Sequence, residues 1–241
     1  MKKIICNNRE EIGKAAAEIV LAQMKRKPDS ILGFATGSSP IPLYNSLIEL
    51  CKKSELDFSR VTSFNLDEYY PIKRENDQSY YYFMWDNLFS HVNIKRENVN
   101  ILNGEAADPA GECRAYDEKI EKMGGIDLQI LGIGHNGHIG FNEPAEFLSA
   151  DTHMVTLTES TIKANSIYFK TEDEMPKSAL TLGLGGIMKA KKIIVVINGS
   201  SKAQAVRRLF DRRVGTDCPG SILNLHNDVT VILDNEAAEL I

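Results

Sequence analysis

Short apolar segments alternate with amphipathic segments along almost the whole chain, and this alternation most restricts how the chain can fold. The apolar segments have the character of β-strands and span residues 3–6, 30–35, 61–66, 126–131, 154–157, 192–197 and 229–233. The amphipathic segments predict helices near residues 9–26, 40–53, 79–90, 108–123, 183–189 and 201–212. Almost continuously apolar strands separated by helices indicate a mostly parallel sheet that helices cover on both faces. We therefore expect a doubly wound, Rossmann-like α/β fold over residues 1–241, as a single domain.

The composition excludes several classes of protein. Apolar residues make up 43% and charged residues 25% of the 241 residues, as in ordinary globular domains, and no apolar segment approaches the ~20 residues of a membrane-spanning helix. The net charge is −5 and no basic block stands out, so we expect no nucleic-acid partner. Four scattered cysteines without a Cys-x-x-Cys pair indicate reduced thiols, and the first residues are too polar for a signal peptide. These features predict a cytoplasmic protein.

A glycine-rich turn follows the apolar segment 126–131 and carries the most chemistry. It places Asn136, His138 and Glu143 among glycines at positions 132, 134, 137 and 140. In a doubly wound fold, ligands bind at such turns, outside the carboxyl ends of the strands. Flanked by an amide and a carboxylate, His138 suits proton transfer, although a purely structural histidine is the alternative. A metal site that also uses His135 fits poorly, because a glycine-rich turn lacks a rigid ligand frame.

Two further turns lead from a strand into a helix and suit phosphate binding. The first contains Thr36, Gly37, Ser38 and Ser39, with Ser39 expected to cap the helix and proline at position 40 to start it. The second places Lys202 in a first helical turn, where a cation is unfavourable unless an anion binds there. A simple connection and a solvated lysine are the alternatives. Neither turn has the spacing of a nucleotide-binding motif, so we expect no nucleotide cofactor.

Asp67 and Glu68 follow the apolar segment 61–66. A carboxylate at the end of a central parallel strand lies where ligands bind, and partial burial would raise its pKa toward that of a general base. The alternative is that Asp67 only caps the following turn.

Taken together, several linked motifs closely resemble those of the glucosamine-6-phosphate deaminases over essentially the full length. They are Ala-Thr-Gly-Ser-Ser-Pro at 35–40, Phe-Asn-Leu-Asp-Glu-Tyr at 64–69, Asp-Gln-Ser-Tyr at 77–80, Gly-His-Ile-Gly-Phe-Asn-Glu-Pro at 137–144, Ala-Asn-Ser at 164–166 and Gly-Ser-Ser-Lys-Ala at 199–203. The related 6-phosphogluconolactonases share the glycine-histidine turn, but the Phe-Asn-Glu-Pro extension resembles the deaminase pattern.

The resemblance implies that the chain converts glucosamine 6-phosphate and water to fructose 6-phosphate and ammonia, without a metal or organic cofactor. It implies that Asp67 removes the C2 proton of the opened sugar. It also implies that His138, with Asn136 and Glu143 as partners, opens the ring. Lys202 and the turn at 36–39 would contact the phosphate of the hexosamine phosphate.

Two positions depart from the pattern of the family. Asn136 stands where some members carry aspartate, so it can orient His138 without adding a second negative charge. Ile167 stands where an arginine that reaches the phosphate is usual, so either Lys163 or Lys170 compensates or the substrate differs. Galactosamine 6-phosphate is the natural alternative substrate.

Other expectations concern the cover of the site and the rival functions. The irregular segment 143–182 is expected to form a mobile lid, and the chain is expected to be a monomer or a small homo-oligomer. A 6-phosphogluconolactonase and a non-catalytic phosphosugar-sensing domain are the competing functions.

Overall fold

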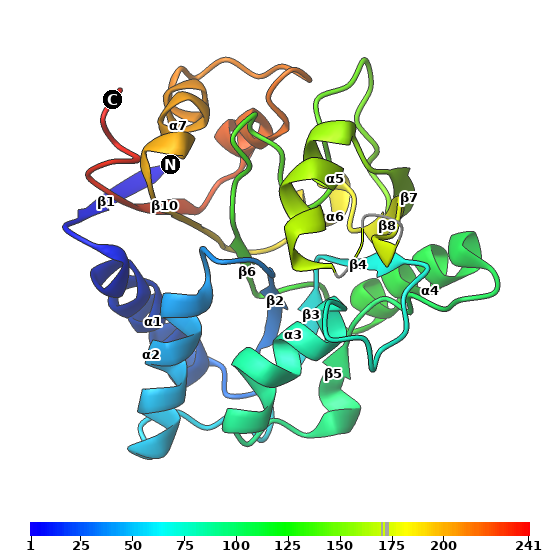
Figure 1. The fold of residues 1–241 in the computed structure, drawn as a ribbon. Coiled ribbons are helices and arrows are strands. Elements are labelled where there is room, and N and C mark those ends of the chain that lie inside the picture. The colour runs from blue at the N-terminus through cyan, green and yellow to red at the C-terminus, as the bar shows by residue number, and fades with distance from the viewer. Residues whose placement is uncertain (170, 172–173) are drawn as a thin grey trace.

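The computed structural model describes residues 1–169, 171 and 174–241 and is built on a seven-stranded sheet. Every strand pair in this sheet is parallel (Figure 1). The strands, in their order across the sheet, are β1 (Lys2–Cys6), β10 (Val229–Asp234), β9 (Ile193–Ile197), β6 (Leu128–Leu131), β2 (Ile31–Phe34), β3 (Thr62–Asn65) and β5 (Val99–Asn100). The mostly parallel α/β fold expected from the sequence is confirmed.

Helices bury both faces of this sheet because successive strand residues point to opposite sides. In β9, Ile194 and Val196 belong to one core cluster with buried residues of α1 (Arg9–Arg26), α2 (Ile41–Lys52) and α3 (Tyr80–Asn87). Ile193, Val195 and Ile197 belong to the cluster on the other face, with buried residues of α4 (Pro109–Lys122), α6 (Leu184–Met188) and α7 (Ala203–Phe210). This two-sided burial explains why β9 is apolar at all five of its positions.

The strand order reverses between β2 and β6, which lie side by side in the middle of the sheet. From β2 the chain continues to β3 and β5 on one side, and from β6 it continues to β9 and β10 on the other. Connections that leave in opposite directions create a crevice at the carboxyl ends of the two central strands. The turns after β2, β3, β6 and β9 therefore lie at the same edge of the sheet.

A second, antiparallel sheet consists of β4 (Asp67–Tyr70), β8 (Ser178–Thr181) and β7 (His153–Thr156). The prediction that segment 154–157 belongs to the main sheet was wrong, because β7 pairs only with β8 in the described part of the chain. The segment 143–182, expected to be irregular, contains β7, α5 (Glu159–Asn165), the 3-10 helix η3 (Ser166–Tyr168) and β8.

The remaining short helices are η1 (Phe89–His91), η2 (Arg96–Asn98), η5 (Ser200–Lys202) and η6 (Pro219–Leu225). One helix start differs from the prediction: α2 begins at Ile41, with Pro40 as its N-cap and no side-chain capping hydrogen bond, so Ser39 does not cap it. No helix within residues 1–169, 171 and 174–241 is both long and apolar enough to cross a membrane.

Candidate active site

The glycine-rich turn after β6 folds around the imidazole of His138. A methyl group on Gly134 would lie 2.1 Å from His138 Cε1, so only glycine leaves room for the ring there. Gly137 has a φ of +88° and Gly140 a φ of +59°, a backbone region that glycine adopts without strain. The glycines at 134, 137 and 140 therefore allow the turn to close on the ring.

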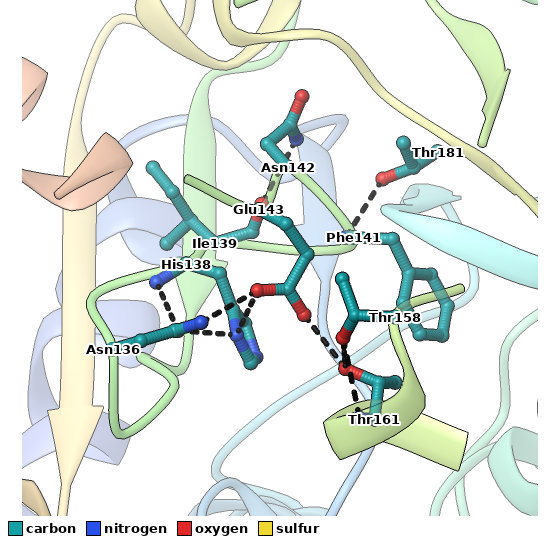
Figure 2. A network of polar contacts seen from close by, with 9 residues as sticks. All are labelled: Asn136, His138, Ile139, Phe141, Asn142, Glu143, Thr158, Thr161 and Thr181. Carbon is teal, nitrogen blue, oxygen red and sulfur yellow. Dashed lines mark hydrogen bonds and ion pairs between the residues drawn. The ribbon is translucent and has the colours of Figure 1, made fainter. Parts of the chain in front are cut away.

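His138 forms a compact polar network with Asn136 and Glu143 (Figure 2). The Nδ1 atom of His138 lies 2.8 Å from Asn136 Oδ1 and 3.2 Å from Glu143 Oε2. Asn136 also donates from Nδ2 to Glu143 Oε2 at 2.7 Å, so the amide bridges the imidazole and the carboxylate. The structure thus brings together the three residues that the sequence placed on this turn, and Nδ1 faces them while Nε2 stays outside the network.

The carboxylate of Glu143 has a third donor, which comes from α5. Thr161 Oγ1 donates to Glu143 Oε1 at 2.7 Å. Burial by itself would raise the pKa of Glu143, but the hydrogen bonds from His138, Thr161 and Asn136 outweigh burial and lower that pKa to about 2. Glu143 is therefore a firmly ionised partner for the imidazole.

Asp67 is the first residue of β4 and comes one position after the predicted end of the preceding strand. Its side chain faces the glycine turn, since a methyl group on Gly140 would lie 3.3 Å from Asp67 Oδ2. Asp67 is only 6% exposed. Burial, reinforced by the nearby charge of Glu68, raises the pKa of Asp67 to about 8. A carboxyl group with this pKa can take up a proton near neutral pH.

Glu68, the neighbour of Asp67, has a structural task. Its carboxylate accepts hydrogen bonds from the backbone N–H groups of Tyr80 and Tyr81 at 2.8 Å, and from that of Tyr69 at 2.9 Å. Tyr80 and Tyr81 are the first two residues of α3, so Glu68 satisfies the start of that helix. The alternative that Asp67 only caps the following turn does not hold, since residues 67–70 form strand β4. The carboxylate of Asp67 has no hydrogen bond or ion pair with residues that the structure describes.

The turn after β2 presents the backbone groups expected of an anion site. Gly37 has a φ of +93°, and the N–H groups of residues 37–39 have no acceptor among the described residues. Arg9, at the start of α1, donates from Nη2 to the carbonyl oxygen of Ser38 at 2.6 Å. Because the N–H of a peptide points away from its C=O, this contact turns the Ser39 N–H away from Arg9. Thr36 and Ser39 are half-buried beside the exposed Gly37 and Ser38.

Lys202 ends the 3-10 helix η5, immediately before α7. Burial lowers the pKa of its ammonium group, which has no hydrogen bond or ion pair within the described part of the chain. Gly199 has a φ of +87° and donates its N–H to the carboxylate of Asp234. Lys202 is thus a half-buried cation with no counter-charge among the described residues, at the same sheet edge as the turn at 36–39. No hydrogen bond between described residues joins either turn to the His138 network.

Sequence reasoning missed the contributions of Arg9, Glu68 and Thr161 to the site. Arg9 and Thr161 are distant in sequence from the groups they contact, and such residues carry no local signal. Glu68 was noticed only as the neighbour of Asp67. Among described residues, no group of three histidine, cysteine, aspartate or glutamate side chains is arranged to hold a metal ion.

The chain matches the family described as glucosamine-6-phosphate isomerases/6-phosphogluconolactonase over residues 7–232. It belongs to this family. It is 56% identical to a glucosamine-6-phosphate deaminase of Thermoanaerobacter sp. (strain X514), over 100% of this chain and 95% of the relative. It is 49% identical to a glucosamine-6-phosphate deaminase of Clostridium perfringens (strain 13 / Type A), over the full length of both.

Solved structures of the family agree with the fold. A monomeric glucosamine-6-phosphate deaminase superposes with a TM-score of 0.97 at 44% identity, over the whole of both chains. A 6-phosphogluconolactonase from Thermotoga maritima superposes with a TM-score of 0.74 at 19% identity, over 97% of this chain and 99% of the other, which shows the shared fold alone.

One position expected to differ from the family is visible in the structure. Ile167, in η3, is 75% exposed, so it neither fills the core nor supplies a cation. Of the two lysines considered as replacements, Lys163 is exposed on α5, and Lys170 lies outside the described residues.

Proposed function

We propose that this chain is a glucosamine-6-phosphate deaminase, which converts glucosamine 6-phosphate and water to fructose 6-phosphate and ammonia. The observation that carries the proposal is the placement of the buried carboxyl group of Asp67 against the turn that holds His138. The deaminases of Thermoanaerobacter and Clostridium perfringens, to which the chain is similar over its full length, support the same reaction.

The first step opens the sugar ring and needs a group that moves a proton in both directions. His138 takes the proton of the C1 hydroxyl and delivers a proton to the ring oxygen, so that the bond from C1 to the ring oxygen breaks and C1 becomes an aldehyde. Nδ1 faces Asn136 and Glu143, and Nε2 is the nitrogen available to substrate. The ionised Glu143 stabilises the imidazolium that forms while the proton is held.

The second step moves a hydrogen from C2 to C1 and uses Asp67 as the base. Asp67 takes the C2 proton, and the electron pair of that C–H bond forms a C1–C2 double bond while the C1 oxygen gains a proton. Asp67 returns its proton to C1 while the ammonium group at C2 gives up one proton to solvent, which leaves a protonated imine at C2. In the substrate-free protein Asp67 is protonated below about pH 8, but a positively charged amino group at C2 lowers its pKa and favours the ionised base.

The last step releases ammonia and consumes one water. Water adds to C2 of the imine, and the C2–N bond breaks to give ammonia and the C2 ketone of fructose 6-phosphate. Lys202 and the backbone N–H groups of residues 37–39 hold the phosphate at the far end of the sugar, with Thr36 beside them. Phosphate binding there supplies orientation for the reacting carbons.

The wider setting of the protein belongs to the same proposal. We propose one domain over residues 1–241 in which residues 143–182 act as a lid, and a monomer or small homo-oligomer. A cytoplasmic location is supported by the four free cysteines. The hexosamine phosphate is the proposed partner, with neither nucleic acid nor membrane.

The test measures ammonia and fructose 6-phosphate after incubation with glucosamine 6-phosphate, with galactosamine 6-phosphate and 6-phosphogluconolactone in parallel. We expect both products in equal amounts from glucosamine 6-phosphate. Asp67→Asn should abolish turnover and retain substrate binding, whereas Asp57→Asn, at an exposed position, should retain turnover. Absence of ammonia from glucosamine 6-phosphate would refute the proposal, and preferential turnover of either parallel compound would replace it.

A further inference from the structure

Helix α5 is joined to the glycine turn that carries His138 through one hydroxyl group. Thr161, on the first turn of α5, is 9% exposed and donates to Glu143 Oε1 at 2.7 Å (Figure 2). The other carboxylate oxygen of Glu143 contacts Asn136 and His138, so one oxygen is bound by α5 and the other by the glycine turn. Among the described residues, Thr161 supplies the hydrogen bond that reaches the His138–Glu143 pair from outside the glycine turn.

The direction of this hydrogen bond is fixed by the neighbouring residue. Thr158 Oγ1 donates to Thr161 Oγ1 at 3.0 Å and also accepts the Thr161 N–H at 3.3 Å, as the N-cap of α5. Because the Thr161 oxygen accepts from Thr158, its own proton is free to be given to Glu143. The orientation of the hydroxyl is therefore built into the start of α5.

We propose that Thr161 is a positioning residue for proton transfer: its hydroxyl holds Glu143 against His138, so that the pair is complete only while α5 lies against the turn. The inference rests on the proposed function, since it assigns Glu143 to the ring-opening step. A carboxylate that lost this donor would keep two contacts on one oxygen and have none on the other. It would be freer to rotate, and its ionised form would be less stable.

The charges around Glu143 determine what a titration of its carboxyl group will report. His138 is the titratable group in contact with it among the described residues, while Asn136 from the turn and Thr161 from α5 are uncharged. The Thr161 hydrogen bond lowers the pKa of Glu143, so its removal raises that pKa. The change has to be followed on Glu143 itself, because Asp67, with a pKa of about 8, sets the acidic limb of the rate profile far above the pKa of Glu143.

The experiment compares Thr161→Val, which keeps the shape and removes the hydroxyl, with Thr161→Ser, which keeps the hydroxyl. For Thr161→Val we expect kcat/KM to fall about ten- to hundredfold, the effect of losing a hydrogen bond to a charged group. We also expect the pKa of the Glu143 carboxyl group, followed by carbon-13 NMR, to be higher in Thr161→Val. Thr161→Ser should restore most of the rate and the wild-type pKa of Glu143. Thr152→Val is the matched control, since Thr152 donates its hydroxyl to the carboxylate of Asp117, away from the catalytic turn.

The outcomes separate positioning from packing. Equal losses in Thr161→Val and Thr161→Ser, an unchanged pKa of Glu143 in Thr161→Val, or a Thr161→Val protein that does not fold would overturn the inference in favour of a structural role. Wild-type rates in Thr161→Val would overturn it as well. A wild-type protein that releases no ammonia would instead refute the proposed function. In that case carbon-13 NMR titration of the Glu143 carboxyl group still decides, because its pKa must be higher in Thr161→Val.

Discussion

Replacing Gly134 by alanine tests whether the position of the His138 ring sets the rate. The added methyl group would lie 2.1–2.3 Å from three atoms of the ring, where ordinary contacts begin at 3.4 Å. The backbone at Gly134 is outside the left-handed region, so alanine itself is not strained there. The ring must therefore retreat by about 1.3 Å, the difference between 2.1 and 3.4 Å. That displacement breaks the 2.8 Å contact from Nδ1 to Asn136 Oδ1.

A misplacement of roughly 1 Å at a catalytic group costs about a hundredfold in rate. We expect kcat of Gly134→Ala to fall by about this factor, with KM changed much less because the phosphate groups lie on other turns. Steady-state kinetics with glucosamine 6-phosphate provides both constants. Gly132→Ala is the matched control on the same turn, since a methyl group there meets no atom within 4 Å among described residues, and its kcat should stay near that of the wild type. A wild-type kcat in Gly134→Ala would refute the assignment of His138.

Three other predictions concern Asp67, Glu68 and Lys202. The kcat/KM of the wild type should rise with pH through about 8 as Asp67 ionises. The midpoint of this rise should move to lower pH in Glu68→Gln, which removes the neighbouring charge. A profile without this rise would contradict the role of Asp67 as base. Burial raises the pKa of Asp67 from 3.8 to about 8 in the folded state, so the folded protein becomes progressively less stable as the pH rises between those values. Thermal melting should therefore find Asp67→Asn more stable than the wild type at pH 8 and equally stable near pH 4. In Lys202→Met, we expect KM to increase about ten- to hundredfold with a smaller change in kcat, and an unchanged KM would remove Lys202 from the phosphate site.

The main sheet was predictable because its strands are buried on both faces. The segments 126–131 and 192–197 are apolar without an alternation of apolar and polar residues. This pattern distinguishes a central parallel strand from a strand with one solvent-exposed face. The strands that were missed lack this property. β4 reads Asp-Glu-Tyr-Tyr and β5 has only two residues, so neither carries a hydrophobic pattern. β8 was hidden in a segment expected to be irregular, and only its pairing with β4 and β7 defines it.

The sequence by itself determined the main architecture and the residues of the glycine turn. A local pattern suffices there, because Asn136, His138 and Glu143 lie within eight positions of one another on a turn whose glycines permit close approach. The family resemblance also rests on such local motifs.

Tertiary structure alone decided how the two acidic neighbours divide their work and which distant residues support the site. Asp67 and Glu68 are both buried and burial raises the pKa of each, but only Glu68 accepts hydrogen bonds from the start of α3, because β4 turns one side chain toward Gly140 and the next toward that helix. Arg9 meets Ser38, and Thr161 meets Glu143, across 29 and 18 positions of the chain. Contacts of this kind arise from the packing of separate elements, and no periodicity or local motif in a single sequence encodes them.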